Sequence, residues 1–146
     1  MYQHILISTD GSEIARKGVD HGLALAKSLG AKVTIVTVSE SVLPYAGNDV
    51  GQGTAMYLEF AAIQKEAAEI VLTGAKEAAD RLGVEADTVC LEFVAPAGAI
   101  VETADARGCD LIVMSSHGRR GLRRLILGSV TSEVLALASI PVLVVW

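Results

Sequence analysis

Hydrophobic positions along this chain alternate between two periods. Short apolar runs of strand length separate stretches in which apolar residues recur every three or four positions, as on one face of a helix. Strands are expected at residues 5–7, 32–38, 88–94, 111–114 and 142–145. Helices are expected at residues 15–29, 57–82, 96–108 and 129–138. This regular alternation predicts an α/β fold with a five-stranded parallel sheet, right-handed crossovers and helices on both faces.

Local signals mark several boundaries. Gly30 and Gly83 are placed to end helices, Pro96 suits a first helical turn, and both Asp10 and Ser12 are candidate N-caps. The polar, glycine-containing residues 39–56 are expected to form a long loop. The buried stripe of the long helix is predicted from its apolar spacing as Phe60, Ile63, Ala67, Ile70, Val71, Gly74, Ala75, Ala78 and Leu82.

The strand order can be predicted from the position of a candidate site. Ligands of open α/β sheets bind at the carboxyl ends of strands, where the strand order reverses. Asp10 follows the first strand, and the loop containing Gly118 follows the fourth. If both line one site, the first and fourth strands are neighbours, which gives the order 3-2-1-4-5. No repeat or linker interrupts the pattern, so one domain over residues 1–146 is expected.

Composition narrows the class of protein. Hydrophobic residues make up 51% of the 146 residues and aromatic residues 4%, so the expected core is aliphatic and alanine-rich. A net charge of −5 argues against a general nucleic-acid binder. No apolar run approaches the ~20 residues of a membrane helix, and no signal peptide is apparent, so a cytoplasmic location is expected. Cys90 and Cys109 lack metal-site spacing and are expected to be reduced, mostly buried thiols.

The segment from Ser115 to Thr131 carries the main chemical signal. It reads S-S-H-G-R-R-G-L-R-R-L-I-L-G-S-V-T, directly after the apolar run 111–114. A strand, a glycine-bearing loop and a helix start together form the usual anion site, because unpaired N–H groups and the helix dipole face the ligand. A simple strand-to-helix turn is the alternative interpretation. Asp10 likewise has a purely structural alternative as an N-cap.

These motifs resemble the universal stress protein family. Its ATP-binding members carry G-x2-G-x9-G-[ST] between the fourth strand and the last helix. Gly118, Gly128 and Ser129 match at the same spacing, whereas the first glycine is replaced by Ser115. The resemblance extends over the whole chain, through the segments 5–12, 33–38, 109–114 and 141–145. It implies a fold of the adenine-nucleotide α-hydrolase type.

The resemblance also implies a ligand, which is ATP, with AMP or ADP as alternatives, together with Mg²⁺ or Mn²⁺ on the phosphates. Asp10 would lie near the adenosine or, as an indirect ligand, near the metal. The backbone at Val38 would form hydrogen bonds with adenine, and Ser115 would lie by the ribose. The phosphates would be held by Gly118, Gly128, Ser129, Val130 and Thr131. The candidate site is Ser8, Thr9, Asp10, Val38, Met114, Ser115, His117, Gly118, Arg119, Arg120, Gly128, Ser129, Val130 and Thr131.

Four arginines form a basic cluster beside the expected phosphates. One interpretation is a solvated basic face. The other is long-range attraction of a polyphosphate, with Arg119 and Arg120 as the candidates for direct contact. The full cluster is Arg119, Arg120, Arg123 and Arg124.

Catalytic motifs are absent from the sequence. There is no G-x4-G-K-[ST], no G-x-S-x-G, no H-E-x-x-H and no C-x-x-C. No catalytic residue is therefore assigned, and slow ATP hydrolysis or autophosphorylation is the most that the family resemblance allows.

Two functions follow from these motifs. The first is an ATP-binding regulator of a stress response, and the second is a nucleotide-free homodimer that acts by protein interaction. In both, family resemblance predicts pairing of two copies through Val142–Val145, an unidentified protein partner, and no nucleic acid or membrane as partner.

Overall fold

The computed structural model describes residues 1–40, 50–93, 95–118 and 126–146, with the backbone alone for residues 40, 50–54 and 93. Its elements are β1 (His4–Ser8), α1 (Glu13–Leu29), β2 (Lys32–Glu40), α2 (Val50–Leu82), β3 (Ala86–Phe93), α3 (Pro96–Ala106), β4 (Leu111–Ser115), α4 (Ser129–Leu137) and β5 (Val142–Val145). The five strands are parallel in the order β3-β2-β1-β4-β5. The predicted fold class and strand order are confirmed.

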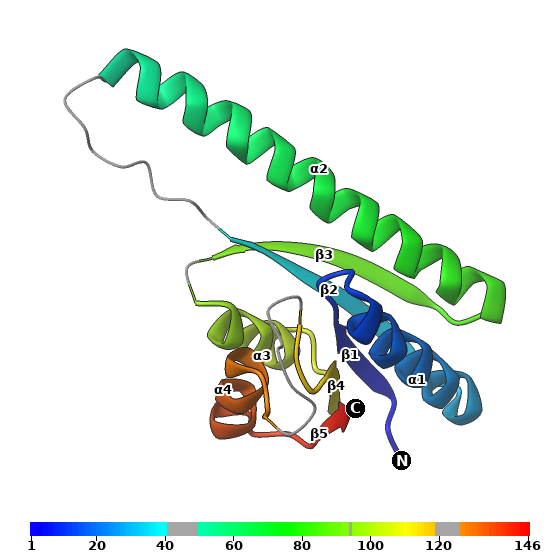
Figure 1. The fold of residues 1–146 in the computed structure, drawn as a ribbon. Coiled ribbons are helices and arrows are strands. Elements are labelled where there is room, and N and C mark those ends of the chain that lie inside the picture. The colour runs from blue at the N-terminus through cyan, green and yellow to red at the C-terminus, as the bar shows by residue number, and fades with distance from the viewer. Residues whose placement is uncertain (41–49, 94, 119–125) are drawn as a thin grey trace.

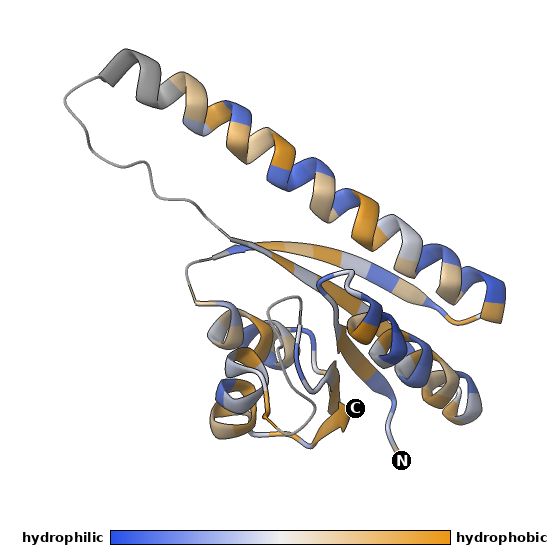
Figure 2. Ribbon diagram, viewed as in Figure 1, coloured by the Kyte–Doolittle hydropathy of each residue, from blue (hydrophilic) through white to orange (hydrophobic). Residues whose placement is uncertain are grey.

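Helices cover both faces of the sheet (Figure 1). Helices α1 and α2 lie on one face, and α3 and α4 lie on the other. Successive strand residues point to opposite faces, so Ile5 and Ile7 pack towards α1 and α2 while Leu6 packs towards α3 and α4. Because both faces are buried, the central strands are continuous apolar runs, which Figure 2 shows as hydrophobic ribbon.

The ends of α1 follow the predicted signals. The hydroxyl of Ser12 accepts a hydrogen bond from the N–H of Ala15 at 3.2 Å, so Ser12 is the N-cap. Asp10 instead accepts from the N–H of Ser12 at 2.9 Å, which stabilises the turn before the cap. Gly30 ends the helix in the left-handed region, with φ of 67°.

Helix α2 differs from its prediction in length and in buried face. It begins at Val50, and β2 extends to Glu40, so residues 39–40 and 50–56 of the expected loop 39–56 are strand and helix; residues 41–49 lie outside the described part. The side chains buried against the sheet are Ala68, Leu72, Ala75 and Ala79. Of the predicted stripe only Ala75 is buried. Alanines occur all round this helix, so apolar spacing did not identify the face that packs.

The cysteine prediction was half right. Cys109 is buried, but Cys90 is exposed on the edge strand β3. An edge strand has a neighbour on one side only, so an apolar residue type there need not be covered. Within the described residues no helix is long and apolar enough to cross a membrane.

Candidate functional site

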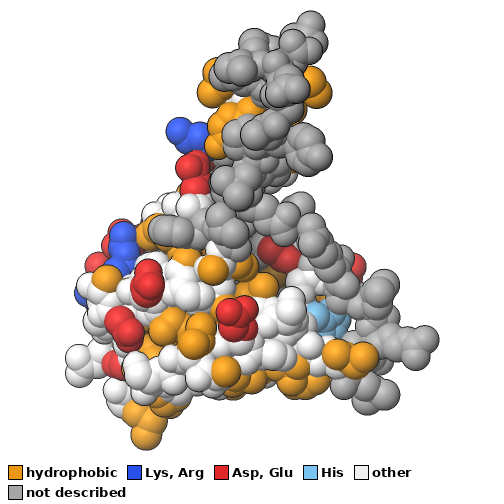
Figure 3. Space-filling model, turned by 90° about the vertical axis from the view of Figure 1, so that its left-hand side faces the viewer, with side chains coloured by type: hydrophobic (Ala, Val, Ile, Leu, Met, Phe, Trp, Pro, Cys, Tyr) orange, Lys and Arg blue, Asp and Glu red, His pale blue; other side chains and the backbone are white. Residues whose placement is uncertain are grey.

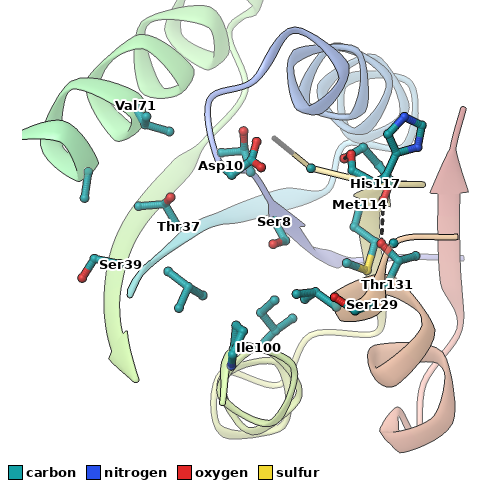
Figure 4. A pocket seen from close by; sticks show the side chains of 18 of the residues that line it. Ser8, Asp10, Thr37, Ser39, Val71, Ile100, Met114, His117, Ser129 and Thr131 are labelled. Atoms are coloured by element: carbon teal, nitrogen blue, oxygen red, sulfur yellow. Dashed lines mark hydrogen bonds between the residues drawn. The ribbon is translucent and has the colours of Figure 1, made fainter. Parts of the chain in front are cut away.

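A pocket of about 510 Å³ opens at the carboxyl end of the sheet (Figure 4). Its wall comes from the ends of β1, β2 and β4, from α2 and α3, and from the start of α4. The lining residues are Ser8, Thr9, Asp10, Thr37, Val38, Ser39, Gln64, Ala67, Ala68, Val71, Pro96, Ile100, Met114, Ser115, His117, Gly118, Gly128, Ser129, Val130 and Thr131.

The fold brings together all the described residues of the predicted site. Twelve of the fourteen lie in the pocket wall, and Arg119 and Arg120, with the rest of the arginine cluster, lie outside the described residues. This follows from the strand order, because β1 and β4 are neighbours and their following loops meet at one edge.

Eight lining residues were missed from the sequence. Most come from α2 and α3, which no motif linked to the site. Two could have been predicted, because Thr37 and Ser39 are polar residues that follow Val33 and Ile35 on the same face of β2, near its carboxyl end. They have the strand parity of Ile35, which packs towards α1 and α2, and so they face α2. The eight are Thr37, Ser39, Gln64, Ala67, Ala68, Val71, Pro96 and Ile100.

A hydrogen-bonded network joins the end of β4 to the start of α4. The hydroxyl of Thr131 donates to the carbonyl of Ser115 at 2.9 Å, and the N–H of Gly128 donates to the carbonyl of Ser116 at 2.7 Å. A Cβ on Gly128 would lie 3.0 Å from the Cα of His117. The two ends of the loop therefore touch through backbone, and glycine at 128 permits that contact.

The start of α4 presents its backbone to the pocket. Gly128 is the N-cap and supplies no side chain to bond the first N–H groups of the helix. Ser129, Val130 and Thr131 line the pocket at this point. N–H groups of a first helical turn have no partner within the helix, and the positive end of the helix dipole coincides with them. This corner of the pocket thus has the chemistry of an anion site.

Asp10 lies against the second motif glycine, Gly118. A Cβ on Gly118 would collide with a carboxylate oxygen of Asp10, so the backbone at 118 lies directly against this side chain. Gly11 next to it has φ of 78°, and a Cβ there would lie 2.5 Å from a methyl group of Val71. Glycine at 11 lets the turn after β1 pass beneath α2 and place Asp10 at the wall.

The end of β2 leaves backbone groups open to the pocket. The carbonyl of Val36 accepts from the N–H of Thr9 at 3.0 Å, so the backbone groups of Val36 point towards β1. Residues two apart in a strand point the same way, and Val38 therefore directs its N–H and carbonyl beyond the last residue of β1.

Comparison with known proteins gives the family. The model of the universal stress protein family matches residues 1–145. The chain belongs to the universal stress protein family. Universal stress protein MJ0531 of Methanocaldococcus jannaschii is 37% identical over 99% of this chain and 82% of its own. YxiE of Bacillus subtilis is 32% identical over 99% of both chains.

Solved structures share the fold of this universal stress protein. The structure of protein MJ0577 superposes with a TM-score of 0.83, at 28% identity over 99% of this chain and 96% of that one. A universal stress protein in complex with cAMP superposes with a TM-score of 0.70, at 26% identity over 99% and 97% of the two chains.

Within this universal stress protein, Ser115 lies at the pocket wall with its side chain on the α1 side of the sheet. It has the strand parity of Val113, which packs towards α1, whereas Met114 packs towards α3. Its hydroxyl donates to the carbonyl of His117 at 2.9 Å. A Cβ on Gly18 of α1 would lie 3.3 Å from the N of Ser115, so α1 covers this side. The hydroxyl is thus used inside the loop.

The site holds no recognisable acid–base pair among its described residues. His117 is buried, its Nδ1 lies 2.9 Å from the hydroxyl of Ser116, and Figure 4 shows its ring turned away from the middle of the pocket. Asp10 is the one carboxylate in the described wall. The described residues also contain no group of three or more His, Cys, Asp or Glu side chains placed to hold a metal ion.

Proposed function

We propose that this universal stress protein binds an adenine nucleotide, ATP foremost, between the ends of β1 and β4, and regulates partners through that binding with slow hydrolysis or none. One observation carries the proposal. The start of α4, capped by a glycine that offers no side chain, opens on a pocket in which Gly118 and Gly128 bring backbone close to the ligand space. A volume of about 510 Å³ is in the range of small-molecule pockets.

The residues suit the parts of a nucleotide in turn. The first-turn N–H groups of α4 are the phosphate donors, with Gly118 and Gly128 allowing the approach. The backbone of Val38 is the partner for the base edge, with Ile100 and Met114 as apolar walls. The related structure with cAMP supports an adenine ligand for this family member.

A divalent cation fits the charge of this site. Asp10 lies against the backbone of Gly118, close to the proposed phosphates, and a carboxylate beside a polyphosphate is unfavourable without a cation. Asp10 alone is not a metal cage, so Mg²⁺ or Mn²⁺ would be carried by the phosphates and held through water. The ion supplies charge neutralisation when bound. We therefore expect tighter ATP binding with Mg²⁺ than without it.

The test is calorimetric titration of nucleotide-stripped protein with Mg-ATP, comparing Ser129→Asp with Ser132→Asp. Both serines are exposed on α4, but only Ser129 lines the pocket. An acidic residue in a first turn stabilises a helix, so Ser129→Asp should fold normally while repelling phosphate. We expect affinity to fall at least about tenfold in Ser129→Asp, which is 1.4 kcal/mol, and to change little in Ser132→Asp. Equal affinities would contradict the assigned phosphate site.

A second function is favoured by a different observation. The edge strand β5 leaves Leu143 and Trp146 exposed, which suits a nucleotide-free protein that acts as a homodimer through this edge. Absence of ATP binding at millimolar concentration in the unmodified protein would favour this alternative over the regulator.

A further inference from the structure

The apolar stripe of α2 that does not reach the sheet has a regular spacing. Its members recur at intervals of four and three residues, which is the repeat of a helix that packs along another helix. We call this row the α2 seam; it consists of Met56, Phe60, Ile63, Ala67, Ile70 and Gly74. At 3.6 residues per turn the seam lies roughly 130° around the helix from the buried Ala68, Leu72, Ala75 and Ala79.

No described residue buries the α2 seam, whose members are exposed along its length. Met56 is 71% exposed, Ile63 57% and Ile70 68%, and Phe60 is also exposed. An ideal Cβ on Gly74 meets nothing within 4 Å. Figure 1 shows α2 continuing past the ends of β2 and β3, and Figure 3 shows hydrophobic side chains on that projecting part. A continuous row of exposed large hydrophobic residues marks an interaction surface.

The large and small residues of the seam are ordered so that two copies of it complement each other when they run in opposite directions. In an antiparallel pair, Met56 lies opposite Gly74 of a second copy, and Ile63 opposite Ala67. Phe60 lies opposite Ile70 in the remaining layer. In the Met56–Gly74 and Ile63–Ala67 layers a large side chain thus fills the space left by a small one, as a packed interface requires. A parallel pair would instead set Phe60 on Phe60 and leave a gap between two copies of Gly74.

We propose that the α2 seam binds the α2 seam of a second copy of this chain as an antiparallel helix pair, whose two-fold axis passes near residue 65. Residues 56–74 span about 27 Å, and contact over that length buries an area on the order of 1,000 Å², near the lower limit for a specific interface. The association is therefore weak. Since Ala67 lines the pocket as well as the seam, the second copy lies beside the pocket mouth.

One charged residue next to the seam predicts how substitution and salt should change the strength of association. Glu66 is exposed next to the seam and close to the two-fold axis, so it faces Glu66 of the second copy. Like charges in contact weaken association. Glu66→Gln should therefore strengthen the pairing severalfold, and added salt should do the same for the unmodified seam.

The first experiment measures association by analytical ultracentrifugation in a Val144→Pro background, which blocks pairing through β5. Ile63→Asp should lower the association constant at least about tenfold, because it places a charge in an apolar layer. The control is Leu58→Asp, since Leu58 is 62% exposed on the same helix but lies off the seam. Both sites are exposed, so circular dichroism should show intact folding. A monomer at all concentrations, or equal effects of the two substitutions, would overturn the proposal.

The second experiment fixes the orientation. In a Cys90→Ser background, a short bis-maleimide should link Glu66→Cys into dimers, because the two copies of residue 66 meet at the axis. Glu59→Cys is the control: it lies on the same side of the helix, yet in the antiparallel pair its two copies are about 20 Å apart along the axis. Equal linking at both positions would rule out the antiparallel register, and linking at neither would rule out the pair.

Discussion

Ser115 replaces a motif glycine, and its hydroxyl is used within the loop that follows β4. A glycine is expected at this position by family resemblance, yet the serine side chain points to the α1 side of the sheet and bonds the carbonyl of His117 at 2.9 Å. The added atoms stabilise the loop and stay out of the volume next to Ile100 and Met114.

Ser115→Gly should therefore change nucleotide affinity by less than about threefold, well under 1.4 kcal/mol. The same substitution should lower the free energy of unfolding by about 1–2 kcal/mol, because it removes one buried hydrogen bond and adds backbone freedom. Calorimetry with Mg-ATP and urea unfolding measure the two quantities. A large gain in affinity would mean that the serine obstructs the ligand after all.

His4 makes stability depend on pH at the opposite end of the sheet. It is 7% exposed, and its Nε2 lies 2.8 Å from the hydroxyl of Thr34. Burial lowers the pKa of His4 below its ordinary 6.5, and the positive charge of Lys32 lowers it further, against smaller opposing effects of a hydrogen bond with the backbone of Arg107 and of the charge of Asp110. The unfolded chain thus takes up a proton more readily than the folded one.

The stabilising effect of neutral His4 should be complete above pH 6.5 and be lost as the pH falls below 6.5 towards the folded-state pKa. Between pH 7.5 and 5.5 the free energy of unfolding should therefore fall more steeply in the unmodified protein than in His4→Gln. Urea unfolding at several pH values gives both slopes. Parallel slopes would show that His4 does not contribute.

At the scale of elements, two helical glycines have opposite roles. Gly22 lies where α1 crosses the sheet, and a Cβ there would come within 2.6 Å of the Cδ1 of the buried Ile7. Gly74 lies in α2, where a Cβ meets nothing within 4 Å. Packing against Ile7 requires a glycine at position 22. Gly74 makes no such contact within a single chain, so there it only lowers helix propensity.

Gly22→Ala should lower the free energy of unfolding by about 1–2 kcal/mol, since overpacking outweighs the gain in helix propensity. Gly74→Ala should raise it by about 0.5–1 kcal/mol. Thermal or urea unfolding at low protein concentration compares them directly. Stabilisation by both substitutions would mean that Ile7 moves aside without cost.

Some element boundaries could be predicted from local sequence signals, and others could not. Strand 142–145 and the cap at Gly30 were predicted correctly, because a run between turn residues and a left-handed glycine are local signals. The start of α2 was missed, because Gly51 and Gly53 resemble loop residues and helix propensity is a weak guide. Its buried face was missed because the alanines that pack carry little hydrophobic signal.

At the scale of the whole molecule, β5 is an edge that pairs with β4 alone within the described sheet. The carbonyls of Pro141 and Val145 accept from β4 and from the residue after it. Val142 and Val144, which alternate with them, direct their N–H groups to the free edge. Pairing of two copies along this edge, which we infer from family resemblance, would use those groups.

Val144→Pro should abolish this pairing, because it removes an outward N–H and leaves the bonds to β4 in place. Val144→Thr is the control that keeps the N–H. Light scattering at micromolar concentration should give a dimer for the control and a smaller species for the proline variant. A dimer in both variants that survives Ile63→Asp would place the main interface elsewhere.

The sequence by itself determined the alternation of helices and strands, the parallel sheet and its strand order. It also identified the segment between β4 and α4 as a candidate anion site. These depend on periodicity, on glycine and cap chemistry, and on the rule that ligands bind where strand order reverses. Only the tertiary structure decided that α2 and α3 complete the pocket with Gln64, Val71 and Ile100, that Ser115 faces α1, and that no described residue buries the α2 seam. Those outcomes depend on how helices rotate against the sheet, and that rotation is set by packing between residues distant in sequence.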